Sequence, residues 1–408
     1  MDKIVVENLY KVFGPEPKKA IKLLEQGMEK SEVLEKTGMT VGVNNASFTI
    51  KEGEVFVIMG LSGSGKSTMV RMFNRLIDPS GGNVIINGKN VTKMGHDELV
   101  KFRLENMSMV FQSFALMPHQ TVLENAAFGL ELAGVPVAKR QERAMDALKQ
   151  VGLEGWEDQM PKQLSGGMQQ RVGLARGLAV DPDIMLMDEA FSALDPLIRT
   201  EMQDELLKLQ EDSSRTIVFI SHDLDEALRI GDRIAIMEGG RVVQVGTPEE
   251  ILQNPADDYV RAFFRGVDPT NVISAGDIAV KTNPTIIKTK KGGIRAALEQ
   301  LNAKDYNHGY VLNAKKQFLG TVSVDSLSNA IDKGQAGEPI DVCFLPEVKA
   351  ASTDDNMQDI LKDVAEKPWP VPVIDDTGKY LGVVSKNRFL KTLHKSDNGN
   401  GQADTVEA

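Results

Sequence analysis

The chain has 408 residues, enough for two or three domains at roughly 150 residues each. Its net charge of −11 lies almost entirely in residues 1–270, which argues against a nucleic-acid-binding surface because such surfaces are normally basic. A single cysteine, Cys343, excludes an internal disulfide, and the five histidines show no metal-ligand spacing. The apolar neighbours of Cys343 predict a buried structural thiol. Without a membrane-length apolar run or a secretion signal, we expect a cytosolic chain unless a partner holds it at a membrane.

The N-terminal part reads as strands around a helical insertion. Residues 3–14 and 41–59 alternate between apolar and polar side chains, as strands do. Between them, residues 15–40 place Ile21 and Leu24 at helical spacing. We expect this helical insertion to serve mainly in packing, with contact to a partner as the alternative.

A glycine-rich loop, GLSGSGKS, occupies residues 60–67 between a predicted strand and a predicted helix. Closely spaced backbone N–H groups at a helix N-terminus can surround a phosphate. In such a loop Lys66 reaches the β- and γ-phosphates and the Ser67 hydroxyl ligates Mg²⁺. We therefore predict an ATP site, which further includes Gly60, Ser62, Gly63, Gly65 and Thr68.

Two more apolar strands, at residues 184–187 and 216–220, each end in polar side chains. Asp188 follows the first strand, where a second acidic ligand for Mg²⁺ is needed. Glu189 comes next and could activate the attacking water, although it could equally cap the next segment. Short apolar runs separated by helices indicate a parallel sheet covered on both faces. Helix-like sequence over residues 113–163 predicts a helical subdomain inserted in this α/β core.

The segment LSGGMQQR at residues 164–171 stands ahead of a helix and forms a second anion site, this one without a lysine. Together with the phosphate loop it resembles the nucleotide-binding subunits of ABC transporters. In that family the phosphate loop of one subunit and this signature of the other enclose ATP. Gln112, residues 192–195 and His222 complete the family pattern in the proper order.

The resemblance implies roles for these residues. Gln112 would sense the γ-phosphate and Mg²⁺ and couple to the membrane partner, His222 would contact the γ-phosphate, and Asp195 would bridge a dimer. It also decides in favour of a catalytic Glu189. Contacts to the ATP of the other subunit would come from Ser165, Gly166 and Gly167.

An aromatic residue near the first strand is expected to stack on adenine in this family. Phe13 holds the usual place, with Tyr10 as the alternative, and a core role is the competing interpretation of Phe13. Because the chain has one phosphate loop and one signature, it must pair with a second subunit. A homodimer is the simplest solution.

The C-terminal part contains an internal repeat. FLGTVS at residues 318–323 aligns with YLGVVS at residues 380–385, an offset of 62 residues. Each copy is preceded by a short strand and, before that, by a helix, so the segment consists of two copies of one α/β unit. This pair resembles a tandem of CBS modules, a regulatory fold that senses nucleotides or ions.

Taken together, the chain resembles the ATP-binding subunit of glycine betaine/proline (osmoprotectant) ABC importers. The implied fold is α/β, an ABC ATPase core at residues 1–270 followed by a tandem CBS domain at 271–395, with modules at about 274–335 and 340–395. We predict a disordered polar tail at residues 396–408.

The implied partners are a membrane permease and a substrate-binding protein or domain, which would hold the chain peripherally at the cytoplasmic face of the membrane. Carnitine, choline and proline are the alternative substrates. A soluble ABC protein of DNA repair or ribosomes is disfavoured, because those usually carry two ATPase units or a long coiled coil.

The role of the CBS pair stays open. Ser326 and Arg388 stand where many adenosine-binding modules carry an Asp for the ribose, so simple AMP or ATP binding is not expected. The pair could bind a cyclic dinucleotide such as cyclic-di-AMP. It could instead sense ionic strength, if the basic run at residues 288–295 binds anionic lipid and salt releases it. The third alternative is dimerisation alone.

Overall fold

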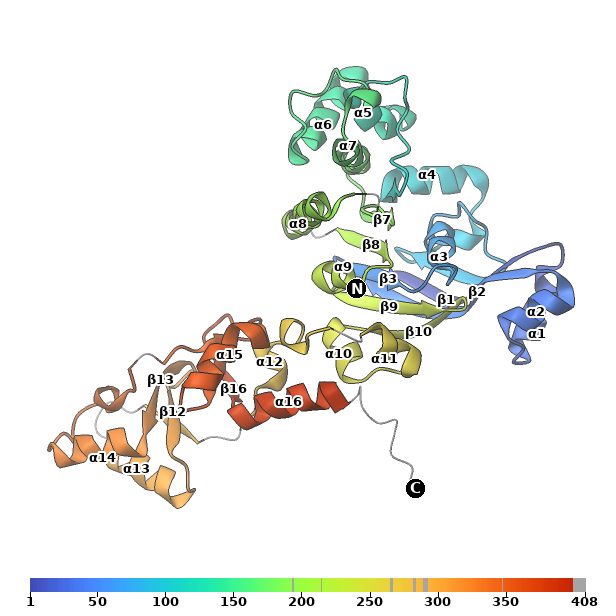
Figure 1. Cartoon of the computed structure of the whole chain (residues 1–408). Coiled ribbons are helices and arrows are strands. Elements are labelled where there is room, and N and C mark those ends of the chain that lie inside the picture. The colour runs from blue at the N-terminus through green and yellow to red at the C-terminus, as the bar shows by residue number, and fades with distance from the viewer. Residues whose placement is uncertain are drawn as a thin grey trace. The chain divides into compact units, whose positions relative to one another are not determined.

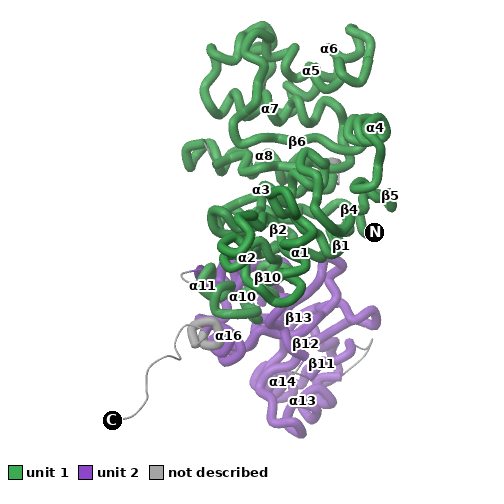
Figure 2. Tube along the Cα trace, turned by 90° about the vertical axis from the view of Figure 1, so that its right-hand side faces the viewer, with its two compact units in different colours: residues 1–264 green, residues 265–408 purple. Residues whose placement is uncertain are grey.

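The structure is a computed structural model of the chain (Figure 1). It describes residues 1–192, 194–213, 215–264, 267–281, 284–288, 293–346 and 348–398. The chain forms two compact units, Met1–Phe264 and Arg265–Ala408, which Figure 2 distinguishes by colour. We describe each unit by itself.

The first unit begins with an antiparallel sheet whose strand order is β2-β1-β4-β5. Side chains on its long strands alternate between buried and exposed, with Ile4 and Val6 in the core, because one face of the sheet packs and the other does not. The strands are β1 (Asp2–Phe13), β2 (Thr40–Lys51), β4 (Gly81–Ile86) and β5 (Lys89–Asn90).

A second sheet of six strands, in the order β10-β9-β3-β8-β7-β6, carries the predicted phosphate loop. All neighbours are parallel except β10, which runs antiparallel to β9. Every residue of β3, β7 and β8 is buried, as expected for a parallel sheet covered on both faces. The strands are β3 (Val55–Met59), β6 (Met107–Phe111), β7 (Ile184–Asp188), β8 (Thr216–Ser221), β9 (Arg233–Glu238) and β10 (Arg241–Gly246).

One hydrophobic core joins the two sheets. Phe48 of β2 stacks on Phe56 of β3 with ring centroids 5.4 Å apart and also contacts Phe73 at 6.3 Å. The core includes α3 (Lys66–Phe73) and the first residues of the chain, so the helix that follows the phosphate loop is held from both sides. The other helices around the sheets are α4 (His96–Asn106), α8 (Pro196–Ser213), α9 (Leu224–Ile230), α10 (Pro248–Gln253) and α11 (Asp258–Phe263).

Three helices form a group apart from the sheets (Figure 1). They are α5 (Val122–Leu132), α6 (Val137–Gln150) and α7 (Gly166–Ala179), and each packs against the other two. Two of them lie within the range 113–163 that the sequence predicts as a helical subdomain. The third begins in the signature segment, so the signature belongs to this subdomain.

The expected insertion consists of two short helices, α1 (Pro17–Glu25) and α2 (Lys30–Thr37). Their inner side chains, Leu24 and Val33, are buried together with Tyr10 of β1 and Met39. The insertion thus has a small core of its own against the ends of β1 and β2.

The second unit contains two copies of one element order. In each copy a short strand pairs in parallel with the first strand of an antiparallel pair, and helices precede and follow that pair. The predicted repeat is therefore present. The first copy has β11 (Thr285–Ile287), α13 (Ile294–Ala303), β12 (His308–Leu312), β13 (Phe318–Ser323) and α14 (Val324–Asp332). The second has β14 (Ala351–Ser352), α15 (Met357–Glu366), β15 (Val371–Ile374), β16 (Tyr380–Val384) and α16 (Lys386–Asn398).

An aromatic cluster connects the two copies. Tyr310 of β12 stacks on Tyr380 of β16 with ring centroids 5.5 Å apart, and Phe318 packs against both. Cys343 is buried in this unit, and burial raises the pKa of its thiol, which confirms the structural thiol expected from sequence.

Two sequence expectations for the second unit fall partly outside the described residues. Of the basic run at 288–295, Lys288 donates a hydrogen bond to Asp341 and Arg295 is exposed, whereas Lys290 and Lys291 are not described. Of the tail at 396–408, the first three residues end α16, and residues 399–408 lie outside the described part.

Candidate nucleotide-binding site

The predicted motifs meet at one edge of the parallel sheet. Strands β3, β8, β7 and β6 are consecutive neighbours, and their ladders pair Met59 with Ser221, Ile220 with Asp188, and Asp188 with Phe111. Their carboxyl ends are therefore aligned. Ligands of open α/β sheets bind at this edge. The motifs that follow these strands are residues 60–67, His222, Asp188 with Glu189, and Gln112.

The phosphate loop follows a path that requires glycine at two positions. Gly60 has φ +152° and Gly65 has φ +103°, and a Cβ on either would lie 2.3 Å from the Met237 carbonyl oxygen or 2.2 Å from that of Gly42. Ser64 in the same loop is buried, and its hydroxyl finds no hydrogen-bond partner among the described residues. A glycine cradle with an unsatisfied buried hydroxyl fits an anion such as a phosphate.

Lys66 begins α3 and is buried. Its ammonium donates hydrogen bonds to the carbonyl oxygens of Gly60, at 2.7 Å, and Leu61, at 3.2 Å. Burial lowers the pKa of Lys66, while the Glu189 and Asp188 carboxylates counteract that shift. The phosphate loop therefore holds the Lys66 ammonium against its own backbone, where a bound phosphate could form an ion pair with it.

Asp188 receives two partners from one face of α3. The Ser67 hydroxyl donates to its Oδ1 at 2.8 Å, and the Arg71 guanidinium reaches its Oδ2 with Nε at 3.1 Å and an Nη nitrogen at 2.9 Å. Sequence reasoning found Ser67 but missed Arg71. The available signal was spacing, because residues four apart share a helix face.

Glu189 lies between two other predicted residues. Its Oε2 accepts a hydrogen bond from Gln112 Nε2 at 3.0 Å, and it lies 3.8 Å from His222 Nδ1, an ion pair only when that imidazole is protonated. Gln112 also donates to the Ser192 hydroxyl at 3.2 Å, a partner that the sequence did not suggest. Gln112, Glu189 and His222, which directly follow β6, β7 and β8, thus form a connected group beside the loop.

Phe13 ends β1 with 43 % of its surface exposed, and Lys11 Nζ lies 4.9 Å from its ring centroid. A Cβ on Gly42 would lie 2.9 Å from Phe13 Cε2 and 3.3 Å from Thr68 Cγ2. The ring is therefore close to the start of α3, and Gly42 makes room for both. Tyr10, the alternative for stacking, is buried in the core of the insertion.

The signature segment lies elsewhere in the same unit. Ser165 caps α7 by accepting a hydrogen bond from the Met168 amide at 3.3 Å, and both Ser165 and Gly166 are exposed. A Cβ on Gly167 would lie 2.8 Å from Ile198 at the start of α8, where Asp195 accepts a bond from the Ile198 amide. Figures 1 and 2 both show α7 in the helical subdomain, away from α3. Within one chain, the signature segment is thus separate from the phosphate loop.

Oxygen groups suited to Mg²⁺ are present, although no cluster of three His, Cys, Asp or Glu side chains that could hold a metal occurs in the described part of the chain. Ser67 and Asp188 offer a hydroxyl and a carboxylate in contact. Mg²⁺ typically binds one or two protein oxygens together with phosphates and water, so this pair fits that ion. Among the described helices, none is long and apolar enough to cross a membrane.

Comparisons with known proteins agree with this geometry. The family model for "ABC transporter" matches residues 43–192, and that for "CBS domain" matches residues 341–395. The chain is 56% identical, over 98% of its length and 99% of the other, to the glycine betaine/proline betaine transport system ATP-binding protein ProV of Escherichia coli (strain K12). It is 49% identical to the glycine betaine transport ATP-binding protein OpuAA of Bacillus subtilis (strain 168), over 96% and 92% of the two chains.

Among solved structures, the dimeric post-hydrolysis state of the ATP-binding cassette MJ0796 bound to ADP and Pi matches with a TM-score of 0.51 and 33% identity. That match covers 60% of this chain and 98% of the other. The fold and these matches define an ABC-type ATPase, which hydrolyses ATP to drive transport. The chain belongs to the ABC transporter family, among the ATP-binding subunits that carry a C-terminal CBS domain.

Proposed function

We propose that this chain energises an importer of glycine betaine and related compatible solutes, as part of the response to osmotic stress. The observation that carries this proposal is the extent of the similarity to ProV. It includes the insertion, the ATPase and the repeat, not the ATPase core alone. The ATPase core alone does not indicate the substrate, because many transporters share it. The combination of insertion, ATPase and repeat is more specific to this group of importers. Carnitine, choline and proline remain the alternative substrates.

The ATP site would be formed by the phosphate loop and the strand ends beside it. Backbone N–H groups of residues 60–68 and the Lys66 ammonium would bind the phosphates, and Phe13 would stack on adenine. Glu189 would orient and deprotonate the attacking water, because its carboxylate follows β7 directly and is held by Gln112. His222 would contact the γ-phosphate.

Mg²⁺ would be held by Ser67 and Asp188, with Gln112 sensing its presence. When bound, the ion neutralises charge on the phosphate oxygens. Arg71 would keep Asp188 oriented while the Ser67 hydroxyl turns from the carboxylate to the ion.

The working unit would be a homodimer. Each subunit would offer its exposed α7 N-terminus, with Ser165, Gly166 and Gly167, to the nucleotide on the loop of its partner, and Asp195 would bridge the two. Closure on ATP and reopening after hydrolysis is a differential-binding switch that can move a permease. With a permease and a substrate-binding protein as partners, the chain would lie at the cytoplasmic face of the membrane.

The CBS pair would regulate this cycle. A cyclic dinucleotide between the modules and ionic-strength sensing through anionic lipid are the two candidate inputs, with simple dimerisation as the third role. Lys288 is already paired with Asp341 at 2.5 Å, so a lipid-binding basic run would depend more on its other members.

The transport assignment is tested with the chain co-purified with its membrane subunits and reconstituted in vesicles. We expect ATP-dependent uptake of radiolabelled glycine betaine that exceeds uptake of proline, choline and carnitine. Equal or greater uptake of one of the other three would replace betaine as the substrate. Absence of ATP-dependent uptake of all four would overturn the osmoprotectant proposal while leaving the ATPase untouched.

A further inference from the structure

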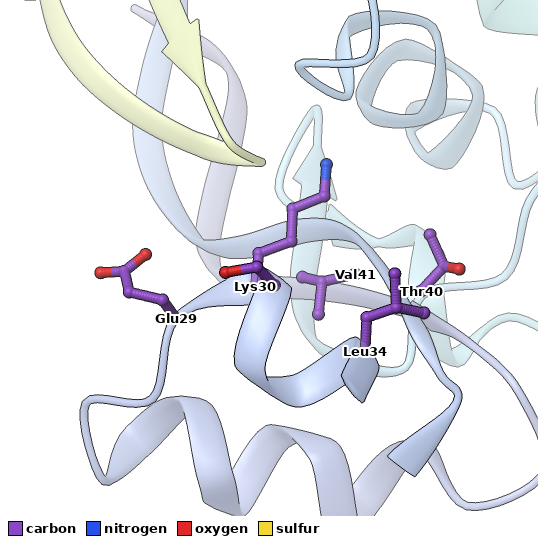
Figure 3. Close-up of a pocket in the computed structure, with 6 residues that line it drawn as sticks. Glu29, Lys30, Leu34, Thr40 and Val41 are labelled. Atoms are coloured by element: carbon purple, nitrogen blue, oxygen red, sulfur yellow. The ribbon is translucent and has the colours of Figure 1, made fainter. Parts of the chain in front are cut away.

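The pocket between the helical insertion and β2 adjoins the phosphate loop and is part of the site described above. Figure 3 shows Lys30 extending from α2, and its ammonium donates a hydrogen bond to the carbonyl oxygen of Gly63 at 3.2 Å. Arg199, near the start of α8, has its partners elsewhere, in the two segments that carry Asp195 and His222.

Arg199 bridges two segments that are distant in the sequence. One Nη nitrogen of its guanidinium lies 3.1 Å from Asp223 Oδ2, and the other donates to the Leu194 carbonyl oxygen at 3.3 Å. Leu194 directly precedes Asp195, and Asp223 directly follows His222. One side chain therefore holds both the residue before Asp195 and the residue after His222.

The Asp223 end of this bridge is fixed to α9. Asp223 Oδ1 accepts hydrogen bonds from two amides in the first turn of that helix, at 3.0 and 3.3 Å. One carboxylate oxygen thus caps α9 while the other binds Arg199. The Asp223 amide also donates to the Ser221 hydroxyl at 2.9 Å. A movement of the guanidinium is therefore transmitted to the residues on both sides of His222.

The Leu194 end is also fixed. Leu194 is buried, and the Asp195 carboxylate accepts a hydrogen bond from the Ile198 amide at 3.1 Å, at the start of α8. A guanidinium is planar and its N–H donors point in fixed directions, so it maintains the relative position of two partners better than a flexible ammonium does. We therefore expect the two segments to move together.

Stability does not account for this arrangement. Arg199 Nε is buried without a hydrogen-bond partner in the described part of the chain, which is unfavourable for an N–H donor. Helices α8 and α9 are also joined by a second ion pair, Arg229 with Asp204 at 2.6 Å, and by the hydrogen bond from Gln203 to Glu226. Joining these two helices therefore does not require Arg199.

We propose that Arg199 is a positioning residue that couples Asp195 to His222. Its two contacts keep the segment that bridges the dimer and the imidazole that meets the γ-phosphate in one relative position. Engagement of Asp195 by the second subunit thereby sets His222 for hydrolysis. This assignment rests on the homodimer and on the role of His222 given under Proposed function, and it adds the residue that links them.

The test measures ATP hydrolysis by the full chain and, by calorimetry, binding of a non-hydrolysable ATP analogue. We expect Arg199→Gln to lower kcat by about ten- to a hundredfold, because a small misplacement of a catalytic group slows the reaction strongly. Analogue binding should not change, because the contacts of Arg199 lie outside the phosphate loop. Arg229→Gln breaks the other ion pair between the same helices and is the matched control, with kcat unchanged. A kcat of Arg199→Gln within about twofold of the unmodified chain, or an equal loss of analogue affinity, would overturn the proposal.

Two further variants separate positioning from stability. Asp223→Asn keeps an oxygen to cap α9 but removes the charge, and combining it with Arg199→Gln should lower kcat no further than either change alone. Losses that multiply would contradict a coupled pair. Arg199→Lys keeps the charge without the planar fork, so its kcat should stay at least several-fold below that of the unmodified chain. Full kcat in Arg199→Lys would show that no bridge to Leu194 is needed.

ATP-bound dimers distinguish this inference from the proposals on which it rests. In a Glu189→Gln background, Arg199→Gln should still form the ATP-bound dimer, because Asp195 is intact. Loss of the dimer on adding Arg199→Gln would mean that Arg199 acts in dimerisation and not in positioning. Absence of the dimer in Glu189→Gln itself would instead contradict the proposed homodimer, and full hydrolysis by His222→Ala would contradict the role of His222.

Discussion

Glu189 occupies an unusual backbone conformation directly after a fully buried strand. Its φ of +48° lies in the left-handed region, which costs a residue with a side chain about 1–2 kcal/mol. Such strain persists where the surrounding structure over-determines it, often at functional sites. Here the conformation accompanies a carboxylate that contacts Gln112 and lies beside His222.

We predict that Glu189→Gln lowers ATP hydrolysis by about 10²–10⁴-fold, because the amide cannot accept the proton of the attacking water. ATP binding should remain, since the neutral amide keeps the shape of the site. The variant should therefore accumulate as an ATP-bound dimer, which size-exclusion chromatography would detect. Glu52→Gln is the control, because Glu52 lies in the turn before β3, at the end of that strand away from the phosphate loop. Undiminished turnover in Glu189→Gln would contradict the proposed role.

At the residue scale, motif spacing predicted several residues of the site, but it did not predict the contacts that hold them in place. Lys66, Ser67 and Asp188 were identified because each belongs to a motif readable within a few residues. Arg71 and Gly42 were missed, because the importance of each depends on a neighbour far along the chain. A glycine that makes room for Phe13 and Thr68 has no signature in its own surroundings.

At the scale of elements, the turn from β8 into α9 holds His222 in place. The buried Glu226 carboxylate accepts hydrogen bonds from Ser221 and from Gln203, and the Ser221 hydroxyl also accepts one from the Asp223 amide. Burial raises the pKa of Glu226, and the bonds from Ser221 and Gln203 only partly oppose this. Glu226 therefore holds its proton more tightly in the folded protein than in the unfolded chain.

It follows that the contribution of Glu226 to stability is fully present below its unfolded pKa and is lost as the pH rises through the raised folded pKa. Glu226→Gln should raise the free energy of unfolding at pH 7 by about 1 kcal/mol. That gain should vanish as the pH falls toward 4.5, the ordinary value for Glu. Urea unfolding at several pH values measures it, with the exposed Glu142→Gln as control. A pH-independent difference would rule out titration as the cause.

The two stacked tyrosines of the repeat differ in one hydrogen bond. The Tyr310 hydroxyl donates to the Pro370 carbonyl at 2.6 Å, whereas the buried Tyr380 hydroxyl has no partner in the described part of the chain. Tyr310→Phe should cost about 1 kcal/mol, and Tyr380→Phe should be neutral or stabilising. Trp369 fluorescence, in a background lacking Trp156, would follow unfolding of this unit. Equal losses would mean that the hydrogen bond from Tyr310 to Pro370 contributes no measurable stability of its own.

Element patterns were predictable where the periodicity was clear. The all-apolar strands β3, β7 and β8 and the repeat in the second unit follow directly from the sequence. Strand β6 was missed because Met107–Phe111 mixes buried and half-buried positions at the end of the sheet, so its pattern is weak. The membership of α7 in the helical subdomain was also missed, since it depends on packing against α5 and α6.

At the scale of the whole molecule, the ATPase and the repeat to which we assign regulation belong to two compact units. Deleting residues 271–408 leaves the first unit, Met1–Phe264, with its complete core and every predicted ATP-site residue. We therefore predict that the truncated chain keeps its basal ATPase activity, while transport by the reconstituted importer loses its dependence on ionic strength. Salt-dependent transport that survives the deletion would place the sensor in another subunit.

The separation of α7 from α3 within one chain has a genetic consequence. Suppose that one population of subunits carries Lys66→Ala and another carries Gly167→Trp, each inactive as a homodimer. In a mixed dimer the intact phosphate loop of the second faces the intact signature of the first, so one complete site is restored. Co-expression of two dead alleles should then recover hydrolysis, up to about half that of the wild-type dimer if its two sites act independently. Absence of recovered hydrolysis would show either that both ATP sites must be intact for one of them to hydrolyse ATP, or that each chain forms a complete site by itself.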